Sequence, residues 1–263
     1  ILFAEGFKAS DQQVTPPPAE GVDALPFEEV LEPFVAWARR EVGRRLKTSK
    51  TNAPKAPRFS AQAWRALERS LLTQLSELLS PALYAEFEQR RPAGRSLLGQ
   101  FLAGELPAGE RPTVYYQDFI AELRGRGILP FLESYPVLAR LLAQTLEAWC
   151  DSTVELFERL RDDLSLIQTH FQWTRRPASV EEIGAALSEP HHGGRLVSAL
   201  TFDSGAKLIY KPRSLQLDAA FGEFLSWCND HAAAFRPQVQ AEPVTFHVIR
   251  LLDRGSHGWA EFV

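Results

Sequence analysis

Apolar residues recur at helical spacing over much of the first two thirds of the chain. They follow three- and four-residue steps over residues 27–46 and, in the longest periodic stretch, over residues 138–171. Such spacing gathers the apolar side chains on one face of a helix. The pattern therefore predicts a helix over 27–46, and over 138–171 either one long helix or two helices joined near Asp151.

Start and stop signals divide the stretch between these two helices. Ser60 is a favoured N-cap residue and predicts a second helix that reaches about Leu79. Pro81 predicts the start of a third helix, because proline is favoured at the first helical position. Residues 92–113 hold three prolines and four glycines, which predicts a long loop. A helix near 115–123 is expected to follow.

The pattern changes from helical spacing to strand-like alternation in the last third of the chain. Two apolar segments, 196–202 and 208–210, flank Asp203-Ser204-Gly205, where glycine supplies the positive φ of a tight turn. This predicts a β-hairpin. A helix is expected over 218–234, followed by two strand candidates, Val244–Leu252 and Gly258–Val263.

These elements predict an α+β fold in three parts. Residues 1–26, which contain three consecutive prolines, are expected to be a linker or loop. Residues 27–177 are expected to be mainly helical. Residues 178–263 are expected to begin an α+β domain with a small antiparallel sheet.

Composition narrows the class of protein. Hydrophobic residues make up 45% and charged residues 24%, as in ordinary globular proteins. A net charge of −4 argues against a general nucleic-acid binder, and no apolar run approaches the ~18 residues of a membrane span. Two distant cysteines favour reduced thiols and a cytoplasmic location. The chain has no Met and starts at Ile1, so we expect a piece of a longer protein.

The charge is unevenly distributed. Residues 39–58 hold eight Lys or Arg residues and a single acid, Glu41. A segment of this kind is either a solvated helix end and loop or a docking site for an acidic peptide or a phosphate. The sequence leaves both interpretations open.

Candidate chemistry is concentrated in the glycine turn 188–195 and the strand segment 210–214. The turn reads SEPHHGGR, and the strand segment reads YKPRS. Glycines let backbone N–H groups approach an anion, and a strand lysine beside them adds positive charge, which is the arrangement of a phosphate clamp. His191 with Glu189 also offers an acid/base pair. The alternatives are exposed turn histidines and a lysine that points into solvent.

The residues that carry these motifs resemble a known family. The stretch LSEPHHGGRLVSALTFDSGAKLIYKPRSLQLDAAFGEFLSWCN at 187–229, together with segments 114–142 and 156–171, resembles the dehydratase domain of class II lanthipeptide synthetases, the LanM family. The closing GWAEFV also fits this family. The resemblance extends over roughly residues 27–263.

The resemblance implies an enzyme of lantibiotic biosynthesis. Members bind a precursor peptide, phosphorylate its Ser and Thr side chains with ATP and Mg²⁺, and eliminate the phosphate to give dehydroalanine and dehydrobutyrine. A separate C-terminal zinc cyclase then adds Cys thiols. The dehydratase resembles a lipid kinase with two lobes preceded by added helices. Residues 178–263 would then be a kinase-like N-lobe.

The resemblance also implies roles for individual residues. Lys211 matches the strand lysine that contacts ATP phosphate, and Arg213 of the same motif is expected to contact phosphate. His191 matches the histidine of the family's Asp-x-His turn, and Glu189 stands where the family usually has Asp. The rest of the cofactor-binding turn is matched by two glycines, Gly193 and Gly194.

Other parts of the family pattern are not matched here. The family's catalytic Asp, His and Asn cluster, its metal-binding Asp and the cyclase would lie beyond Val263, so no metal ligand is assigned and the fragment alone is expected to be inactive. The alternative function is a non-catalytic peptide-binding module that retains the N-lobe, with the basic segment 39–58 holding the peptide. A third possibility is an unrelated ATP-dependent small-molecule kinase.

Overall fold

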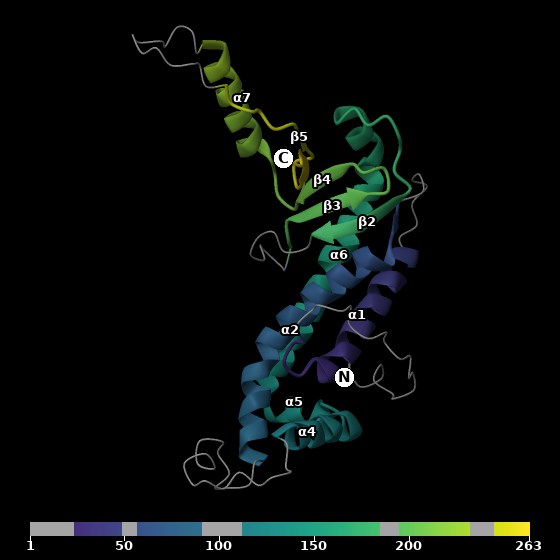
Figure 1. The fold of residues 1–263 in the computed structure, drawn as a ribbon, viewed down its shortest axis with the longest axis vertical. Coiled ribbons are helices and arrows are strands. Elements are labelled where there is room, and N and C mark those ends of the chain that lie inside the picture. Colours follow the sequence, from purple (N-terminus) through teal and green to yellow (C-terminus); the bar gives the residue numbers. More distant parts are fainter. Residues whose placement is uncertain (1–23, 49–56, 91–111, 185–194, 232–244) are drawn as a thin grey trace. The chain divides into compact units, whose positions relative to one another are not determined.

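The computed structural model describes residues 24–48, 57–90, 112–184, 195–231 and 245–263 (Figure 1). The described helices are α1 (Glu28–Thr48), α2 (Ala61–Arg90), α4 (Pro112–Arg126), α5 (Leu129–Ser134), α6 (Pro136–His170) and α7 (Gln216–His231). The described strands are β1 (Arg58–Phe59), β2 (Ser179–Gly184), β3 (Ser198–Phe202), β4 (Lys207–Lys211), β5 (Leu251–Asp253) and β6 (Gly258–Glu261). The chain is therefore a mixed α+β protein, as expected.

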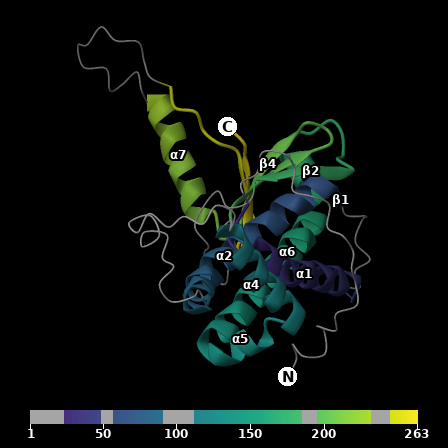
Figure 2. The same cartoon turned by 60° about the horizontal axis from the view of Figure 1, so that its bottom comes forward.

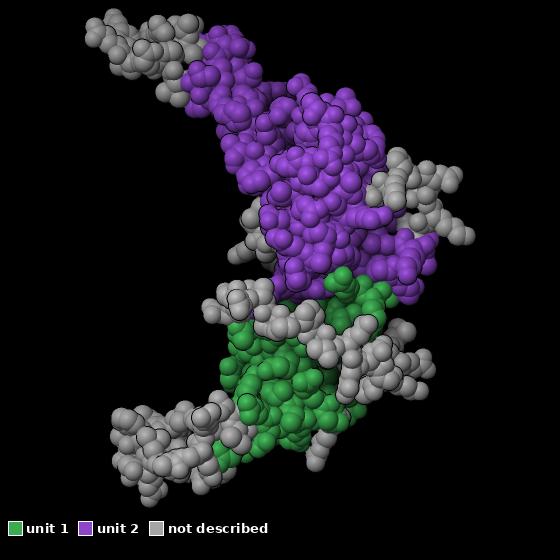
Figure 3. Space-filling model, turned by 45° about the vertical axis from the view of Figure 1, so that its right-hand side comes forward, with its two compact units in different colours: residues 1–41, 71–147 green, residues 42–70, 148–263 purple. Residues whose placement is uncertain are grey.

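The chain divides into two compact units (Figure 3). Unit 1 contains residues 1–41 and 71–147, and unit 2 contains residues 42–70 and 148–263. Unit 1 is helical throughout its described part. Unit 2 holds the sheet and α7 together with segments of α1, α2 and α6.

The core of unit 1 is built from the predicted apolar stripes. Phe27 is fully buried, its ring lies 4.7 Å from that of Tyr84, and its backbone N–H donates to the hydroxyl of Tyr116 at 3.0 Å. The helix predicted over 27–46 is confirmed as α1, and the helix expected near 115–123 is confirmed as α4. Short α5 directly follows α4 (Figure 2).

The prediction of a third helix starting at Pro81 is wrong, because α2 continues through this proline to Arg90. Proline lacks the N–H that would bond to the carbonyl four residues earlier, which weakens a helix interior. The apolar stripe nevertheless continues on both sides of it, and its four leucines have no exposed surface: Leu71, Leu75, Leu79 and Leu83. Burial of this stripe offsets the missing hydrogen bond.

The predicted N-cap at Ser60 is confirmed in unit 2. Its Oγ accepts the N–H of Ala63 at 3.0 Å and donates to the carbonyl of Glu181 in β2 at 2.6 Å. The same hydroxyl thus caps α2 and ties the helix start to the sheet.

Replacing Ser60 by Ala should lower the free energy of unfolding by about 1 kcal/mol, because the capping acceptor is lost. Equilibrium urea denaturation followed by circular dichroism would measure this change. Ser60→Thr keeps a hydroxyl that can cap the helix and should recover most of the loss. Equal stability of Ser60→Ala and the unmodified chain would show that the cap is not needed.

Helix α6 settles one alternative left open by the sequence. It runs as a single helix from Pro136 to His170, without a break at Asp151. Asp151 instead accepts a hydrogen bond from Arg45 at 2.6 Å within unit 2. In that unit, the buried face of α6 includes Leu156, Leu160 and Leu164.

The sheet of unit 2 has six strands in the order β1-β2-β3-β4-β6-β5. The predicted hairpin is confirmed as β3 and β4, and Gly205 has the expected positive φ of 80°. The expectation of a purely antiparallel sheet is wrong, because β1 pairs in parallel with β2. In the sequence, β1 is separated from β2 by several helices, including α2 and α6. Parallel pairing needs such a long crossover connection between the two strands.

The final elements depart from the sequence expectations in their length and burial. Of the strand expected over 244–252, only the end forms a strand, β5. The strand expected over 258–263 is confirmed as β6. The helix expected over 218–234 is confirmed as α7, which has no buried residue. Four of its large apolar side chains are exposed: Leu217, Phe221, Phe224 and Trp227.

Some expectations cannot be compared with the structure. Almost all of the proposed linker 1–26 and of the loop 92–113 lies outside the described residues. Among the helices that are described, none is both long enough and apolar enough to cross a membrane.

Candidate functional site

Strand β4 presents Lys211 on the side opposite to its buried tyrosine. Leu208 and Tyr210 of β4 are buried, and the residues between and after them are more exposed. Because side chains alternate between the two faces of a strand, Lys211 leaves the sheet on the face away from Tyr210. Its side chain is 25% exposed. The strand thus holds a cation at a partly buried position.

Asp218 brings Lys211 and Arg213 together. The ammonium Nζ of Lys211 donates to Asp218 Oδ1 at 2.7 Å. The guanidinium of Arg213 donates to both carboxylate oxygens of Asp218, at 2.6 and 3.2 Å. The two cations expected to contact phosphate therefore converge on one carboxylate in the first turn of α7.

The carboxylate of Asp218 is held in its charged form. Burial by itself raises the pKa of Asp218, but the hydrogen bonds from Arg213 and Lys211 outweigh this effect, and the pKa lies below its ordinary value. A second carboxylate, that of Asp253, accepts the backbone N–H of Leu215 just before α7, so two cations and two carboxylates lie at the start of this helix.

The segment between β4 and α7 is fixed by contacts with the last two strands. The backbone N–H of Leu215 donates to Asp253 Oδ1 at 2.9 Å, and the Leu215 side chain is fully buried. Gly258 of β6, which pairs with Lys211, leaves room for that side chain. A Cβ at position 258 would lie 2.4 Å from a Leu215 methyl group. The backbone that carries the two cations is consequently well packed.

A second group of charged residues braces β4 from the face of α6. Arg159 donates to the Tyr210 hydroxyl at 2.5 Å, and it also forms an ion pair with Glu155 one turn earlier in α6. Glu155 in turn accepts two hydrogen bonds from Arg195, at 2.6 and 3.3 Å. Figure 1 shows α6 beside the strands that these contacts join. Tyr210, which precedes Lys211, and Arg195, the last residue of the glycine turn, are thus both held by α6.

The structure places only part of the expected site. Lys211 and Arg213 lie together on Asp218, and Arg195 contacts α6. The four candidates of the glycine turn lie outside the described residues: Glu189, His191, Gly193 and Gly194. Within the described part of the chain, no group of three or more His, Cys, Asp or Glu side chains is arranged to hold a metal ion.

Sequence reasoning did not identify Asp218, Glu155 or Arg159 as members of the site. Asp218 lies seven residues after Lys211 in the first helical turn, where an acidic residue is also expected merely as a helix-start signal. Glu155 and Arg159 belong to the polar face of a long amphipathic helix. Nothing in their spacing distinguishes them from solvated surface charges.

Comparisons with known proteins support the expected resemblance. Residues 135–263 match the model of a family described as a domain of unknown function, DUF4135. The chain is also similar to the lacticin 481/lactococcin biosynthesis protein LcnDR2 of Lactococcus lactis subsp. lactis, with 25% identity over 158 residues. This match covers 59% of the chain and 16% of the relative. Both matches agree with the resemblance to class II lanthipeptide synthetases that the sequence motifs indicate, and the chain spans about a sixth of the length of this relative.

Proposed function

We propose that this chain is part of a lanthipeptide-modifying enzyme and that residues 178–263 form a kinase-like lobe that holds the phosphates of ATP. The similarity to a lacticin 481 biosynthesis protein supports the biosynthetic role. The convergence of Lys211 and Arg213 on Asp218 is the observation that carries the assignment of the phosphate site. In the proposed reaction, ATP phosphorylates Ser and Thr of a precursor peptide, and elimination of phosphate leaves dehydroamino acids.

The donors present fit a polyphosphate. An ammonium has three hydrogens, and Asp218 takes one of those of Lys211. The planar guanidinium of Arg213 is suited to phosphate oxygens, and its side chain is 50% exposed. When bound, MgATP would supply the transferable phosphoryl group, and Lys211 would orient and neutralise its phosphate oxygens. Asp218 would keep the two cations convergent before the nucleotide arrives.

Among the candidates of the glycine turn, Gly193 and Gly194 are proposed to offer backbone N–H groups to the phosphates. His191 and Glu189 are proposed to take part in proton transfer. These roles rest on the family resemblance. The Mg²⁺ ligands and the remaining catalytic groups are proposed to lie outside this chain, so that the chain binds nucleotide without turning it over.

Calorimetry separates this proposal from the alternative of a non-catalytic peptide-binding module. The chain would be titrated with a non-hydrolysable MgATP analogue and, separately, with a Ser/Thr-containing precursor peptide. Saturable binding of the nucleotide is expected, because Lys211 and Arg213 would contact its phosphates. Binding of the peptide without any binding of nucleotide would contradict the proposal and favour the module.

A further inference from the structure

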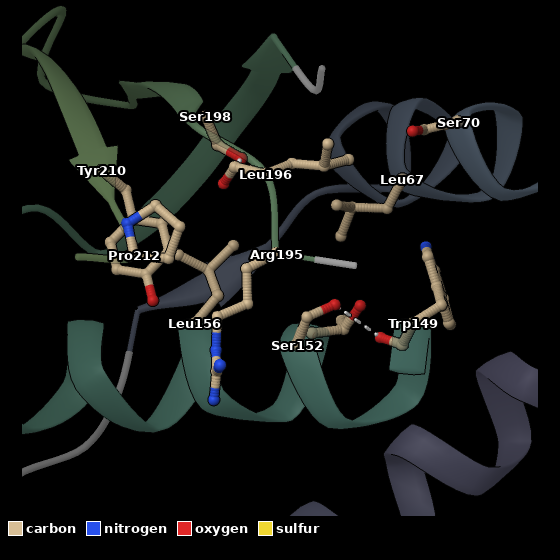
Figure 4. Close-up of a pocket in the computed structure, with 11 residues that line it drawn as sticks. Leu67, Ser70, Trp149, Ser152, Leu156, Arg195, Leu196, Ser198, Tyr210 and Pro212 are labelled. Carbon is tan, nitrogen blue, oxygen red and sulfur yellow. Dashed lines mark hydrogen bonds between the residues drawn. The ribbon is translucent and has the colours of Figure 1, made fainter. Parts of the chain in front are cut away.

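The pocket enclosed by α2, α6 and the end of β4 is too small for a ligand (Figure 4). Its internal volume is about 30 Å³, which is room for about one water molecule. No fully buried side-chain nitrogen or oxygen atom among the described residues lacks a hydrogen-bond partner. A partner of unit 2 other than the nucleotide would therefore bind at its surface.

Helix α7 carries a row of large apolar side chains at that surface. Leu217, Phe221, Phe224 and Trp227 follow one another at steps of four, three and three residues, which places them on one side of the helix. Neighbouring aromatic rings of this row lie 6.4 and 6.5 Å apart, so the row is continuous. Phe221 and Phe224 are 59% and 55% exposed. These four residues are called the α7 stripe.

The stripe is not the side by which α7 is attached to the rest of unit 2. Asp218 accepts the hydrogen bonds from Lys211 and Arg213, and Asn229 exchanges two hydrogen bonds of 2.8 Å with the backbone of Phe246. Residues 218 and 229 lie on one side of the helix, roughly a third of a turn from the stripe. Figure 2 shows the segment before β5 running along α7. The stripe therefore points away from the contacts that anchor its helix.

Two acidic residues border the stripe along one edge. Glu223 and Asp230 are exposed and lie seven positions apart, which is two helical turns or about 10 Å. Among the residues that the structure describes, neither forms an ion pair or a hydrogen bond. The helix contains no Lys or Arg. The surface thus combines an apolar row with an acidic edge of defined spacing.

We infer that the α7 stripe is covered by a basic amphipathic helix from another part of the longer protein to which this chain belongs. Apolar side chains of that helix would pack on the stripe, and their removal from water supplies the attraction. Lys or Arg residues seven positions apart on the same helix would pair with Glu223 and Asp230.

The assignment of this partner to the same protein rests on the proposed function, whereas the chemistry of the surface does not. The match that covers 59% of this chain covers only 16% of LcnDR2, so most of that relative lies outside the matched segment. A protein of this kind has further regions from which a covering helix can come.

The charges of α7 disfavour two other occupants. In a parallel pair of α7 helices from two copies, Glu223 and Asp230 would each face the same acid, and in an antiparallel pair Asp230 would approach Asp218. Like charges that face each other weaken an interface. A helix that lies on a membrane typically carries Lys and Arg on its polar face, and α7 has neither.

Hydroxyl-radical footprinting read by mass spectrometry tests the inference in the protein as its gene encodes it. The oxidation rate of each residue would be compared with its rate in the urea-unfolded protein. Covered Phe221 and Phe224 should oxidise at least about tenfold more slowly, whereas the exposure seen here predicts only about a twofold reduction. Tyr84 in unit 1, which is 46% exposed, is the control and should show about a twofold reduction.

The variant Glu223→Lys/Asp230→Lys tests whether the partner is basic. The protection of Phe224 would be followed as urea is added, and the midpoint of its loss should fall by roughly 1 M, because like charges would then face each other. Asp118→Lys/Glu133→Lys is the matched control. It reverses two exposed acids of unit 1, on α4 and α5, and should leave that midpoint unchanged.

Each outcome decides the inference. Protection that is independent of protein concentration and weakened by the α7 charge reversal alone supports it. Absence of protection, or equal urea midpoints with and without the α7 reversal, would overturn it. Protection that needs a high protein concentration or added precursor peptide would also overturn it, in favour of a second copy or a separate polypeptide. Loss of nucleotide binding with an intact, protected stripe would contradict the proposed function alone, so the two failures are distinguishable.

Discussion

Replacing Lys211 by Ala should weaken the binding of MgATP by about tenfold to a hundredfold, which is the value of a charge-assisted hydrogen bond to a phosphate. The variant removes the ammonium that β4 holds beside Arg213, while Asp218 keeps its partner in Arg213. Fluorescence anisotropy with a labelled ATP analogue would measure the affinity. The folded structure should persist, because the Lys211 side chain is partly exposed and no apolar core is lost.

Lys207 provides a matched control for this variant. It lies at the other end of the same strand, and its ammonium contacts the ring of Phe262 at 5.0 Å. Lys207→Ala removes the same charge from the same strand and should leave the nucleotide affinity within about twofold, because distant surface charges are screened. Equal losses of nucleotide affinity in both variants would mean that Lys211 acts only through its general positive charge and not through a specific contact with phosphate.

Replacing Asp163 by Ala should lower the free energy of unfolding by about 3 to 5 kcal/mol, the usual result of breaking a buried charged group away from its partners. The Asp163 side chain is 3% exposed and receives hydrogen bonds from His257, Trp259 and Arg254 at 2.7, 2.8 and 2.9 Å. It joins α6 to β6 and to the turn before it. Without the carboxylate, the buried imidazole and indole N–H groups lose their acceptor.

Asp162→Asn is the matched control for stability, because this neighbouring carboxylate is exposed and pairs with Arg161 on the same helix. Its effect should stay within about 0.5 kcal/mol. Urea denaturation of both variants at neutral pH would provide the comparison. A loss below 1 kcal/mol for Asp163→Ala would contradict the assigned role of the buried carboxylate.

The same carboxylate predicts a dependence of stability on pH. Burial raises the pKa of Asp163, but hydrogen bonds from His257 and Trp259 and the charge of Arg254 outweigh it, so the pKa lies below its ordinary value of 3.8. A depressed pKa means that the stabilisation is complete above the unfolded value and is lost as the pH falls toward the folded value. Denaturation below pH 3.8 should therefore show a steeper loss of stability in the unmodified chain than in Asp163→Asn.

The sequence predicted the features that depend on local patterns. Helical spacing identified α1 and α6, and Ser60 and Gly205 marked a cap and a turn whose causes are local. The break expected at Pro81 failed because tertiary burial of an apolar stripe outweighed a local helix-breaking signal. Local signals are reliable only where packing does not oppose them.

The contacts that complete the site could not be predicted in the same way. The pairing of Glu155 with Arg195 joins residues 40 positions apart, and Arg159 reaches Tyr210 over 51 positions. Charged residues on a helix surface give no sequence signal of a distant partner. The motif identified Lys211 and Arg213, but the role of Asp218 became visible only when α7 was placed against the end of β4.

Mass spectrometry of a Ser/Thr-containing precursor peptide tests the central proposal most directly. The protein would be produced as its gene encodes it, with whatever sequence flanks this chain, and incubated with the peptide, ATP and Mg²⁺. The unmodified protein should yield phosphorylated peptide followed by peptide that has lost water at Ser and Thr, and Lys211→Ala should yield neither. Undiminished dehydration by the Lys211 variant would contradict the account.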